Sequence, residues 1–235
     1  MADEYWVSSD ESARAVRILL GGVGPRLRMG GSVRLDATGP KKSGSISPPL
    51  QPLASDNVIV LFSQSHGLEY DPSIHEALSA ELRSVLQRVP SVRLVIKAHP
   101  SEPVSQYEDH LAHLPRVTVV RGTAGAGEVA AAASCCVALD STALFEAVLA
   151  GALVVQAVPE GDSMVVQQVA AHRVPLASLG VFLSNVLANS GAMDSALAFQ
   201  QEQLPGLLAH VGRAGAAQGE ALKQLLYKEG EGDAR

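Results

Sequence analysis

The chain has 235 residues, of which 47% are hydrophobic, with 18 lysines and arginines against 24 aspartates and glutamates. This length and apolar content suffice for a well-buried core and exclude a disordered acidic chain. The formal net charge of -6 argues against a general nucleic-acid binder, because a phosphate backbone requires a basic surface.

The first residues and the cysteines predict the compartment. No apolar run reaches the roughly 18 residues of a membrane span, and residues 1–6 lack the basic and apolar regions of a signal peptide. Cys135 and Cys136 are adjacent in an apolar stretch, which predicts buried thiols in a reducing compartment. We therefore expect a cytoplasmic protein, either free or peripheral to the inner face of the membrane. No metal-ligand spacing is present, and no cofactor is expected.

The first part of the chain carries short elements and then a linker. Residues 9–20 have a helical pattern, with Ser9 or Asp10 as the N-cap, and Arg26 to Met29 read as a short strand. Residues 37–56 are rich in Gly, Pro, Lys and Ser and have no hydrophobic period, which is typical of a linker.

Strands and helices then alternate regularly. Buried strands are predicted at 58–62, 92–96, 117–120, 136–139 and 153–157. Helices are predicted at 72–89, 107–114, 128–133 and 142–150, the first with Leu78, Leu82, Val85 and Leu86 on one face. This alternation predicts an α/β fold, a doubly wound Rossmann-like parallel sheet with helices on both faces. Residues 176–227 are helical in period, with no further strand.

Polar residues follow the predicted strands. In a doubly wound sheet the ligand lies beyond the carboxyl ends of the strands, so these positions are the candidates for a site. Ser63, Gln64 and Ser65 follow the first strand and are suited to bind an anion or a sugar, unless they form an ordinary polar loop. Lys97 and His99 follow the second strand. The His99 imidazole either donates to a phosphate or lies in a surface turn, and the Lys97 ammonium group either adds positive charge or extends into solvent.

The fourth strand is followed by Asp140, Ser141 and Thr142 at the start of a helix. A phosphate there gains amide and hydroxyl donors, although Ser141 or Asp140 also suits the role of an N-cap. Glu146 lies one turn further on, where it accepts from ribose hydroxyls or is a solvated helix residue. The loop 159–163 after the fifth strand either closes over the site or is an ordinary loop. The GxGxxG, GxxxxGK[ST] and GxSxG motifs are absent, which argues against a dinucleotide dehydrogenase, a P-loop protein and an α/β-hydrolase.

Two of these patterns resemble a known family. The His99–Pro100 pair and the run Thr142-x-x-x-Glu146-Ala-x-x-x-Gly151 are similar to the C-terminal, donor-binding domain of GT-B-fold glycosyltransferases. Within that fold they most resemble CDP-glycerol glycerophosphotransferases and bacterial capsule polysialyltransferase-like enzymes, and the UDP-GlcNAc 2-epimerases share part of the pattern. Residues 31–36, Gly-Ser-Val-Arg-Leu-Asp, resemble the crossing out of the N-terminal domain of such proteins.

The resemblance implies a domain organisation and a set of roles. Residues 1–36 would be the end of a truncated N-terminal GT-B domain, 37–56 a linker, 57–175 the nucleotide-sugar donor-binding domain and 176–235 a helical tail. His99 would be the catalytic residue and contact the donor phosphate. Ser141 and Thr142 would cradle the same phosphate, Glu146 would hold the ribose, and Ser63, Gln64 and Ser65 would line the donor, with Lys97 adding charge.

The expected function follows from the same resemblance. The chain would be the donor-binding half of a metal-independent glycosyltransferase or glycerophosphotransferase of surface polysaccharide biosynthesis, with a CMP-, CDP- or UDP-linked donor. Such an enzyme needs a second domain that supplies the acceptor site and the catalytic base, so the isolated chain is expected to be inactive without that domain or a second polypeptide. The alternatives are a non-catalytic binding or scaffold module and a relative of UDP-GlcNAc 2-epimerase.

Overall fold

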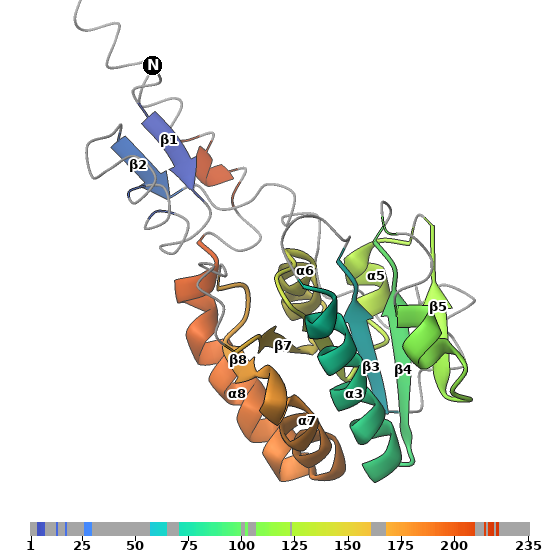
Figure 1. Ribbon diagram of the computed structural model, residues 1–235. Helices are drawn as coiled ribbons and strands as arrows, with labels where there is room; N and C mark the ends of the chain where they lie inside the picture. Colours follow the sequence, from blue (N-terminus) through green and yellow to red (C-terminus); the bar gives the residue numbers. More distant parts are fainter. Residues whose placement is uncertain are drawn as a thin grey trace, which may run out of the picture. The chain divides into compact units, whose positions relative to one another are not determined.

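The computed structural model describes residues 4–7, 13, 17, 26–29, 57–64, 71–99, 102, 107–122, 124–160, 168–209, 214, 216–218 and 220. The chain forms two compact units, one made of residues 1–39 and 204–235 and the other of residues 40–203. The second unit contains the large sheet and nearly all of the described helices (Figure 1).

The first unit contains a pair of short parallel strands. Strand β1 (Glu4–Val7) pairs with β2 (Arg26–Met29) in the register Glu4↔Arg26 to Val7↔Met29. The predicted strand at 26–29 is therefore confirmed. Of the helix predicted at 9–20, only Ala13 and Arg17 are described, both helical, and the predicted linker at 37–56 lies outside the described residues.

The second unit is built on a six-stranded sheet in which every pairing is parallel. Its spatial order is β5-β4-β3-β6-β7-β8, which is 3-2-1-4-5-6 when the strands of this sheet are counted along the chain. Its strands are β3 (Asn57–Phe62), β4 (Val92–Lys97), β5 (Val117–Val120), β6 (Cys135–Ala138), β7 (Leu153–Val158) and β8 (His172–Pro175). The predicted doubly wound Rossmann-like fold is confirmed.

Helices cover both faces of this sheet, as expected for right-handed crossovers between parallel strands (Figure 1). Helix α3 packs with α7 on one face, and α5 packs with α6 on the other. The helical segments are α3 (Pro72–Arg88), η2 (Glu108–Ala112), α5 (Ala126–Ala130), α6 (Ala143–Leu149), η3 (Leu176–Ser178), α7 (Leu179–Ala188) and α8 (Ser190–Leu207).

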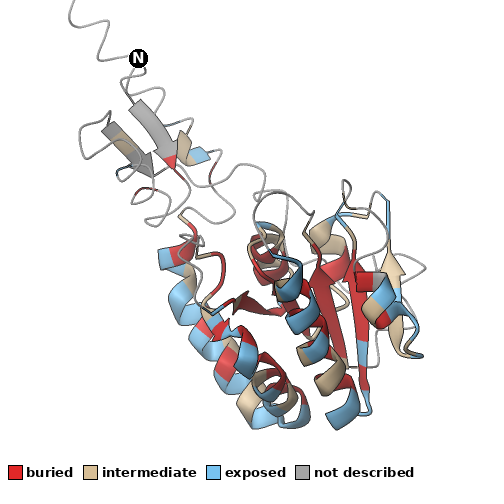
Figure 2. Cartoon of the chain, in the orientation of Figure 1, coloured by how far each residue is buried: buried red, intermediate tan, exposed pale blue. Residues whose placement is uncertain are grey.

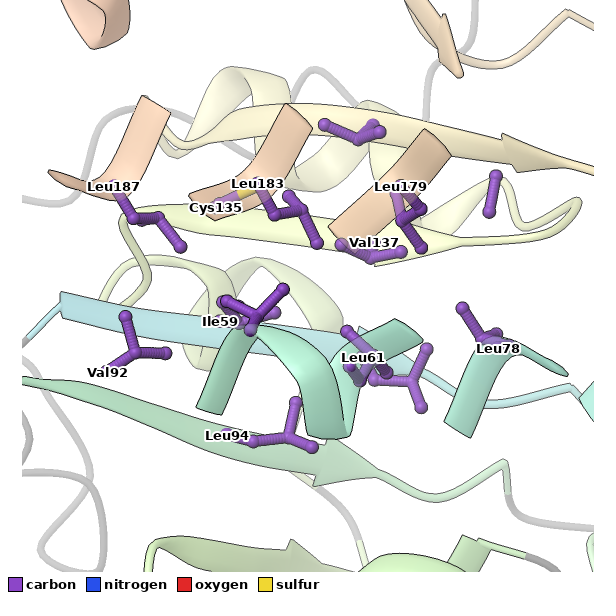
Figure 3. Packing of buried hydrophobic residues seen from close by; sticks show 14 of the residues in the cluster. Ile59, Leu61, Leu78, Val92, Leu94, Cys135, Val137, Leu179, Leu183 and Leu187 are labelled. Atoms are coloured by element: carbon purple, nitrogen blue, oxygen red, sulfur yellow. The ribbon is translucent and has the colours of Figure 1, made fainter. Parts of the chain in front are cut away.

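The core lies between the sheet and the helices of each face. On the α3 side, alternate strand residues such as Ile59 and Leu61 face the helices, since successive side chains of a strand point to opposite faces (Figure 3). Helix α3 meets them with Leu78, Leu82 and Val85, spaced at a helical period and all fully buried. Burial of one such side chain stabilises the fold by about 1.5–3 kcal/mol. The opposite side of α3 is exposed (Figure 2).

Helix α3 begins and ends at recognisable signals. Asp71 caps its start by accepting a hydrogen bond from the Ser73 amide at 2.8 Å, and Pro72 occupies the first turn, where no amide donor is needed. Helix α7 approaches α3 closely at Gly180, where a Cβ would lie 2.7 Å from the Glu81 Oε2 and 3.1 Å from the Glu81 carbonyl oxygen. The Gly180 amide donates to that carboxylate at 2.7 Å.

Three predicted elements differ in the structure. Strand β8 was not predicted, because an edge strand of four residues with two exposed positions has no continuous apolar run. The segment predicted as an ordinary helix at 107–114 is a π-helix over Glu108–Ala112. Helix α5 spans Ala126–Ala130 rather than 128–133, because the chain turns at Ala131–Ala132 to reach β6.

The two cysteines and the lengths of the helices can be compared with the sequence predictions. Cys135 and Cys136 are free and fully buried in β6, as predicted, and burial raises the pKa of both thiols well above the usual value. Among the described residues, no single helix is long and apolar enough to cross a bilayer, and only the segments 176–188 and 190–207, bent by 111°, reach that length and composition together.

Candidate functional site

The sheet order points to one place for a ligand. The chain crosses from β3 to β4 and on to β5 in one direction, and then returns from β5 to β6 on the other side of β3, so the order of strands reverses between β3 and β6. In open α/β sheets ligands bind beyond the carboxyl ends of the strands at such a reversal. The described segments that leave β3, β4 and β6 at this edge begin at Ser63, Ala98 and Leu139.

Ser63 joins the end of β3 to the turn after β4. Its side chain is buried, and its Oγ accepts a hydrogen bond from the His99 amide at 2.9 Å. The Ser63 hydroxyl faces two acceptors, the Lys97 carbonyl oxygen at 3.3 Å and the Glu102 carboxylate. The predicted donor-lining residue Ser63 therefore already holds two loops of this edge together.

Gln64 joins the end of β3 to the end of β6. Its Oε1 accepts from the Asp140 amide at 2.8 Å, and its Nε2 donates to the Asp140 carbonyl oxygen. Since Leu61 pairs with Val137 in the sheet, residues 64 and 140 lie opposite each other by the same register. The Gln64 side chain thus continues the β3–β6 pairing past the last strand residues and orients the segment that leads into α6.

Lys97 and His99 lie at the end of β4, as predicted. Lys97 is largely buried, and its Nζ donates to the Gly122 carbonyl oxygen at 3.1 Å, with the Ala98 carbonyl oxygen at 3.5 Å. Desolvation lowers the pKa of this ammonium group. The partners that the structure gives it are neutral, so its positive charge contributes to the potential at this edge. The His99 side chain is exposed, whereas its amide is held by Ser63.

Ser141 and Thr142 precede α6, a helix of seven residues. The Ser141 Oγ accepts from the Ala143 amide at 3.3 Å, and the carbonyl oxygens of both residues accept from the next turn. Ser141 thus caps the start of α6 in part, which was the alternative to phosphate binding that the sequence offered. Thr142 is exposed, and no side-chain capping hydrogen bond is formed by it.

Glu146 is half-buried and binds a neighbouring helix, so it is not a simple solvated residue. Its Oε2 accepts from the Gly127 amide, in the first turn of α5, at 3.2 Å. The carboxylate therefore bridges α5 and α6, the two helices that cover the same face of the sheet. Acceptance of a backbone amide at a helix start is favourable for an anionic side chain.

Sequence reasoning missed Glu102, which lies with Ser63 and the His99 backbone. The one available signal was its spacing three residues after His99, which the structure uses for a turn closed by the Glu102 amide and the His99 carbonyl oxygen at 3.0 Å. Ser65 lies outside the described residues, as does most of the loop 159–163, of which only Pro159 and Glu160 are described. No cluster of His, Cys, Asp or Glu suited to a metal is found in the described part of the chain.

The strand order and the crossovers define a Rossmann-type α/β domain, in which three strand-end segments converge at the β3–β6 reversal. No protein-family model matches the sequence, and no curated protein matches it either. Solved structures match the fold over nearly the whole chain.

Three of these structures indicate the kind of fold. UDP-GlcNAc 2-epimerase from Neisseria meningitidis, bound to UDP-GlcNAc, has a TM-score of 0.68 at 11% identity, with 95% of this chain and 62% of that chain covered. Sucrose-phosphate synthase from Thermosynechococcus elongatus has 0.67 at 17%, with 97% and 59% covered. The Anabaena protein HepE, in complex with UDP and glucose, has 0.62 at 16%, with 97% and 64% covered.

The comparison establishes the fold, a Rossmann-like α/β sheet of the kind found in GT-B glycosyltransferase-like proteins. Two of the three similar structures contain UDP or a UDP-sugar. This chain spans about three fifths of the length of the structures that it matches.

Proposed function

We propose that this chain binds the nucleotide of a nucleotide-linked donor at the carboxyl edge of its sheet, near the ends of β3, β4 and β6. It would act as the donor-binding half of a metal-independent glycosyltransferase or glycerophosphotransferase in surface polysaccharide biosynthesis. The observation that carries the proposal is the joining of three strand-end segments at this edge, by Ser63 to His99 and by Gln64 to Asp140. Its support from outside the chain is the fold shared with UDP-containing structures.

In this proposal the phosphate is bound by donors from the ends of β4 and β6. His99 donates from an exposed ring, and Lys97 supplies positive charge from a largely buried position nearby in sequence. Ser141 and Thr142 add hydroxyl donors from the segment before α6. Fixed donors aimed at a leaving phosphate stabilise the charge that develops on it, so transfer can proceed without a metal.

The other proposed contacts concern the nucleoside. Glu146 would accept from the ribose hydroxyls, a role compatible with its hydrogen bond to Gly127 because a carboxylate can accept several hydrogen bonds. Ser63, Gln64 and Ser65 would line the donor. Since Ser63 and Gln64 bind other segments of this edge, their main proposed contribution is to hold its shape.

The proposed reaction also requires an acceptor site and a catalytic base. The structures compared above are longer than this chain, which spans 59–64% of them. We place the acceptor site and the base on a further domain or a second polypeptide, and expect this chain alone to bind a donor without transferring it.

Calorimetric titration with CMP, CDP, UMP and UDP tests the proposal. We expect saturable binding that prefers one base, and a loss of about 10- to 150-fold in affinity for His99→Ala, since a charge-assisted hydrogen bond contributes about 1.5–3 kcal/mol. The matched control is His113→Ala, another exposed histidine, which precedes β5 at the opposite edge of the sheet. Equal affinities of the two variants would refute the role of His99.

The similarity to the Neisseria epimerase supports a second candidate, a relative of UDP-GlcNAc 2-epimerase. Turnover of UDP-GlcNAc by this chain, seen as a changed sugar or released UDP, would favour the epimerase relative, because a donor-binding half leaves the compound intact. Absence of binding at millimolar nucleotide would favour the third possibility, a scaffold module that has the fold without the ligand.

A further inference from the structure

The turn after β4 contains a carboxylate whose hydrogen bonds all serve the backbone and side chains around His99. The Glu102 Oε2 accepts from the Ser63 hydroxyl and from the His99 amide, the latter at 3.2 Å. The Ser63 Oγ accepts from the same His99 amide at 2.9 Å. Glu102, Ser63 and the His99 backbone thus form a closed triangle of hydrogen bonds, in which a single amide is shared by two acceptors.

This triangle restrains the backbone of a residue whose side chain is exposed. The His99 side chain is exposed, and the turn from His99 to Glu102 is closed by one backbone hydrogen bond of 3.0 Å. An exposed loop residue usually samples several backbone conformations, because few contacts favour any one of them. The His99 amide has two acceptors, one from the end of β3 and one from its own turn, and both hydrogen bonds favour the conformation that the structure shows.

Tyr107, five residues after Glu102, is anchored in the interior. Tyr107 is buried, and its hydroxyl lies 2.6 Å from the Nδ1 of His75, a buried residue of α3. Burial, together with the negative charge of Glu102, raises the pKa of Tyr107 well above its usual value. The Tyr107 phenol is therefore neutral, and its contact with His75 fixes it to α3.

A carboxylate is otherwise an unfavourable neighbour for a phosphate, because two negative charges repel. A carboxylate at this edge is explained if the two hydrogen bonds that it accepts stabilise the turn by more than its charge weakens phosphate binding. We propose that Glu102 is a positioning residue, whose carboxylate fixes the turn that carries His99 and so sets the place of the imidazole at the carboxyl edge. Its consequence for ligand binding rests on the proposed function above, whereas its effect on the turn does not.

Two substitutions separate the acceptor atom from the charge. Glu102→Gln keeps an oxygen that can replace Oε2, which alone accepts both hydrogen bonds, and removes the negative charge. Glu102→Ala removes both. The matched control is Glu76→Ala, which removes an exposed carboxylate of α3.

The first readout is amide hydrogen exchange measured by NMR. We expect exchange at His99 to be at least tenfold faster in Glu102→Ala and within twofold of the starting protein in Glu102→Gln and Glu76→Ala. The internal reference is the Ala98 amide, which donates to the Val120 carbonyl oxygen at 3.0 Å and should not change. If Glu102→Ala does not fold, Glu102→Asp replaces it, because the shorter side chain withdraws the acceptor and keeps the charge.

The second readout is calorimetric affinity for UDP and for uridine. Glu102→Ala should weaken UDP at least fivefold, Glu102→Gln should bind UDP as well as the starting protein or better, and uridine, which has no phosphate, should not distinguish them. Unchanged His99 exchange in Glu102→Ala would overturn the inference, as would equal acceleration in the Gln and Ala variants. If the unsubstituted protein binds none of CMP, CDP, UMP and UDP, the proposed function fails, and the exchange measurement still decides the role of Glu102.

Discussion

Replacement of Gln200 tests how much the hydrogen bonds of one α8 side chain to the backbone of β7 contribute to stability. Its Oε1 accepts from the Val154 amide at 2.7 Å, and its Nε2 donates to the Ala152 carbonyl oxygen at 2.9 Å. These groups lie at the start of β7, before Val155, where pairing with β8 begins. The Gln200 side chain therefore completes the edge of β7 where β8 is absent.

The expected cost of Gln200→Leu follows from this geometry. Gln200 is 1% exposed, and Leu is similar in size but has no polar group, so the Val154 amide and the Ala152 carbonyl oxygen lose these partners. Each buried polar group left without a partner costs about 1–3 kcal/mol, and recovered apolar burial offsets part of the total. We expect the free energy of unfolding to fall by about 2–4 kcal/mol.

Urea denaturation followed by circular dichroism measures this change, with Gln201→Leu as control. Gln201 is the next residue of α8 and is exposed, so its replacement should alter stability by no more than about 0.5 kcal/mol. Gln64→Leu removes the same pair of hydrogen bonds at a half-buried position and should cost less than Gln200→Leu, because water can reach the released groups. A loss for Gln200→Leu no greater than that for Gln201→Leu would refute the reasoning.

Two further predictions concern stability. Arg116→Ala should lower the free energy of unfolding by about 2–3 kcal/mol in the same assay. The Arg116 guanidinium donates to the carbonyl oxygens of Leu86, in the last turn of α3, and of Val89, just after it, the latter at 3.2 Å. The control is Arg88→Ala, which removes an exposed arginine of the same turn and should cost about 0.5 kcal/mol or less. Burial raises the pKa of Cys135, Cys136 and Tyr107, so the stability that these neutral groups contribute is complete below their unfolded-state pKa values of roughly 8.5 and 10 and falls as the pH rises above them. The free energy of unfolding measured at pH 8, 9 and 10 should decrease, and an increase would contradict the assigned burial.

The interior strands were predictable because their residues are apolar on both faces. Strands β3, β4 and β7 begin or end within one residue of the predicted bounds, since a strand covered by helices on both sides reads as a continuous run of Val, Ile and Leu. The edge strand β8 has no such run. The π-helix at Glu108–Ala112 was not predictable either, because its hydrogen bonds differ from those of an α-helix by one residue while the apolar pattern is similar.

The candidate site was predictable by position and not by contact. The rule that ligands lie beyond strand ends selected Ser63, Gln64 and His99, and the structure brings the segments that carry them together. The rule cannot say which of these side chains bind other parts of the protein, because that depends on distances across the sheet. Glu102 was missed for the same reason, since its partner Ser63 is 39 residues away in the sequence.

Polar side chains at this edge fall into two groups with different expected effects on replacement. Gln64 and Ser63 bind backbone groups of neighbouring segments, so their replacement should alter the shape of the edge and its stability before it alters any single ligand contact. His99 and Thr142 present exposed side chains, so their replacement should alter ligand affinity with little change in stability. If this edge is a donor site, replacement of Ser63 or Gln64 should lower stability, and replacement of His99 or Thr142 should lower ligand affinity. If replacement of His99 or Thr142 instead reduced stability and left nucleotide affinity unchanged, the edge would be structural and the scaffold reading of this fold would be favoured.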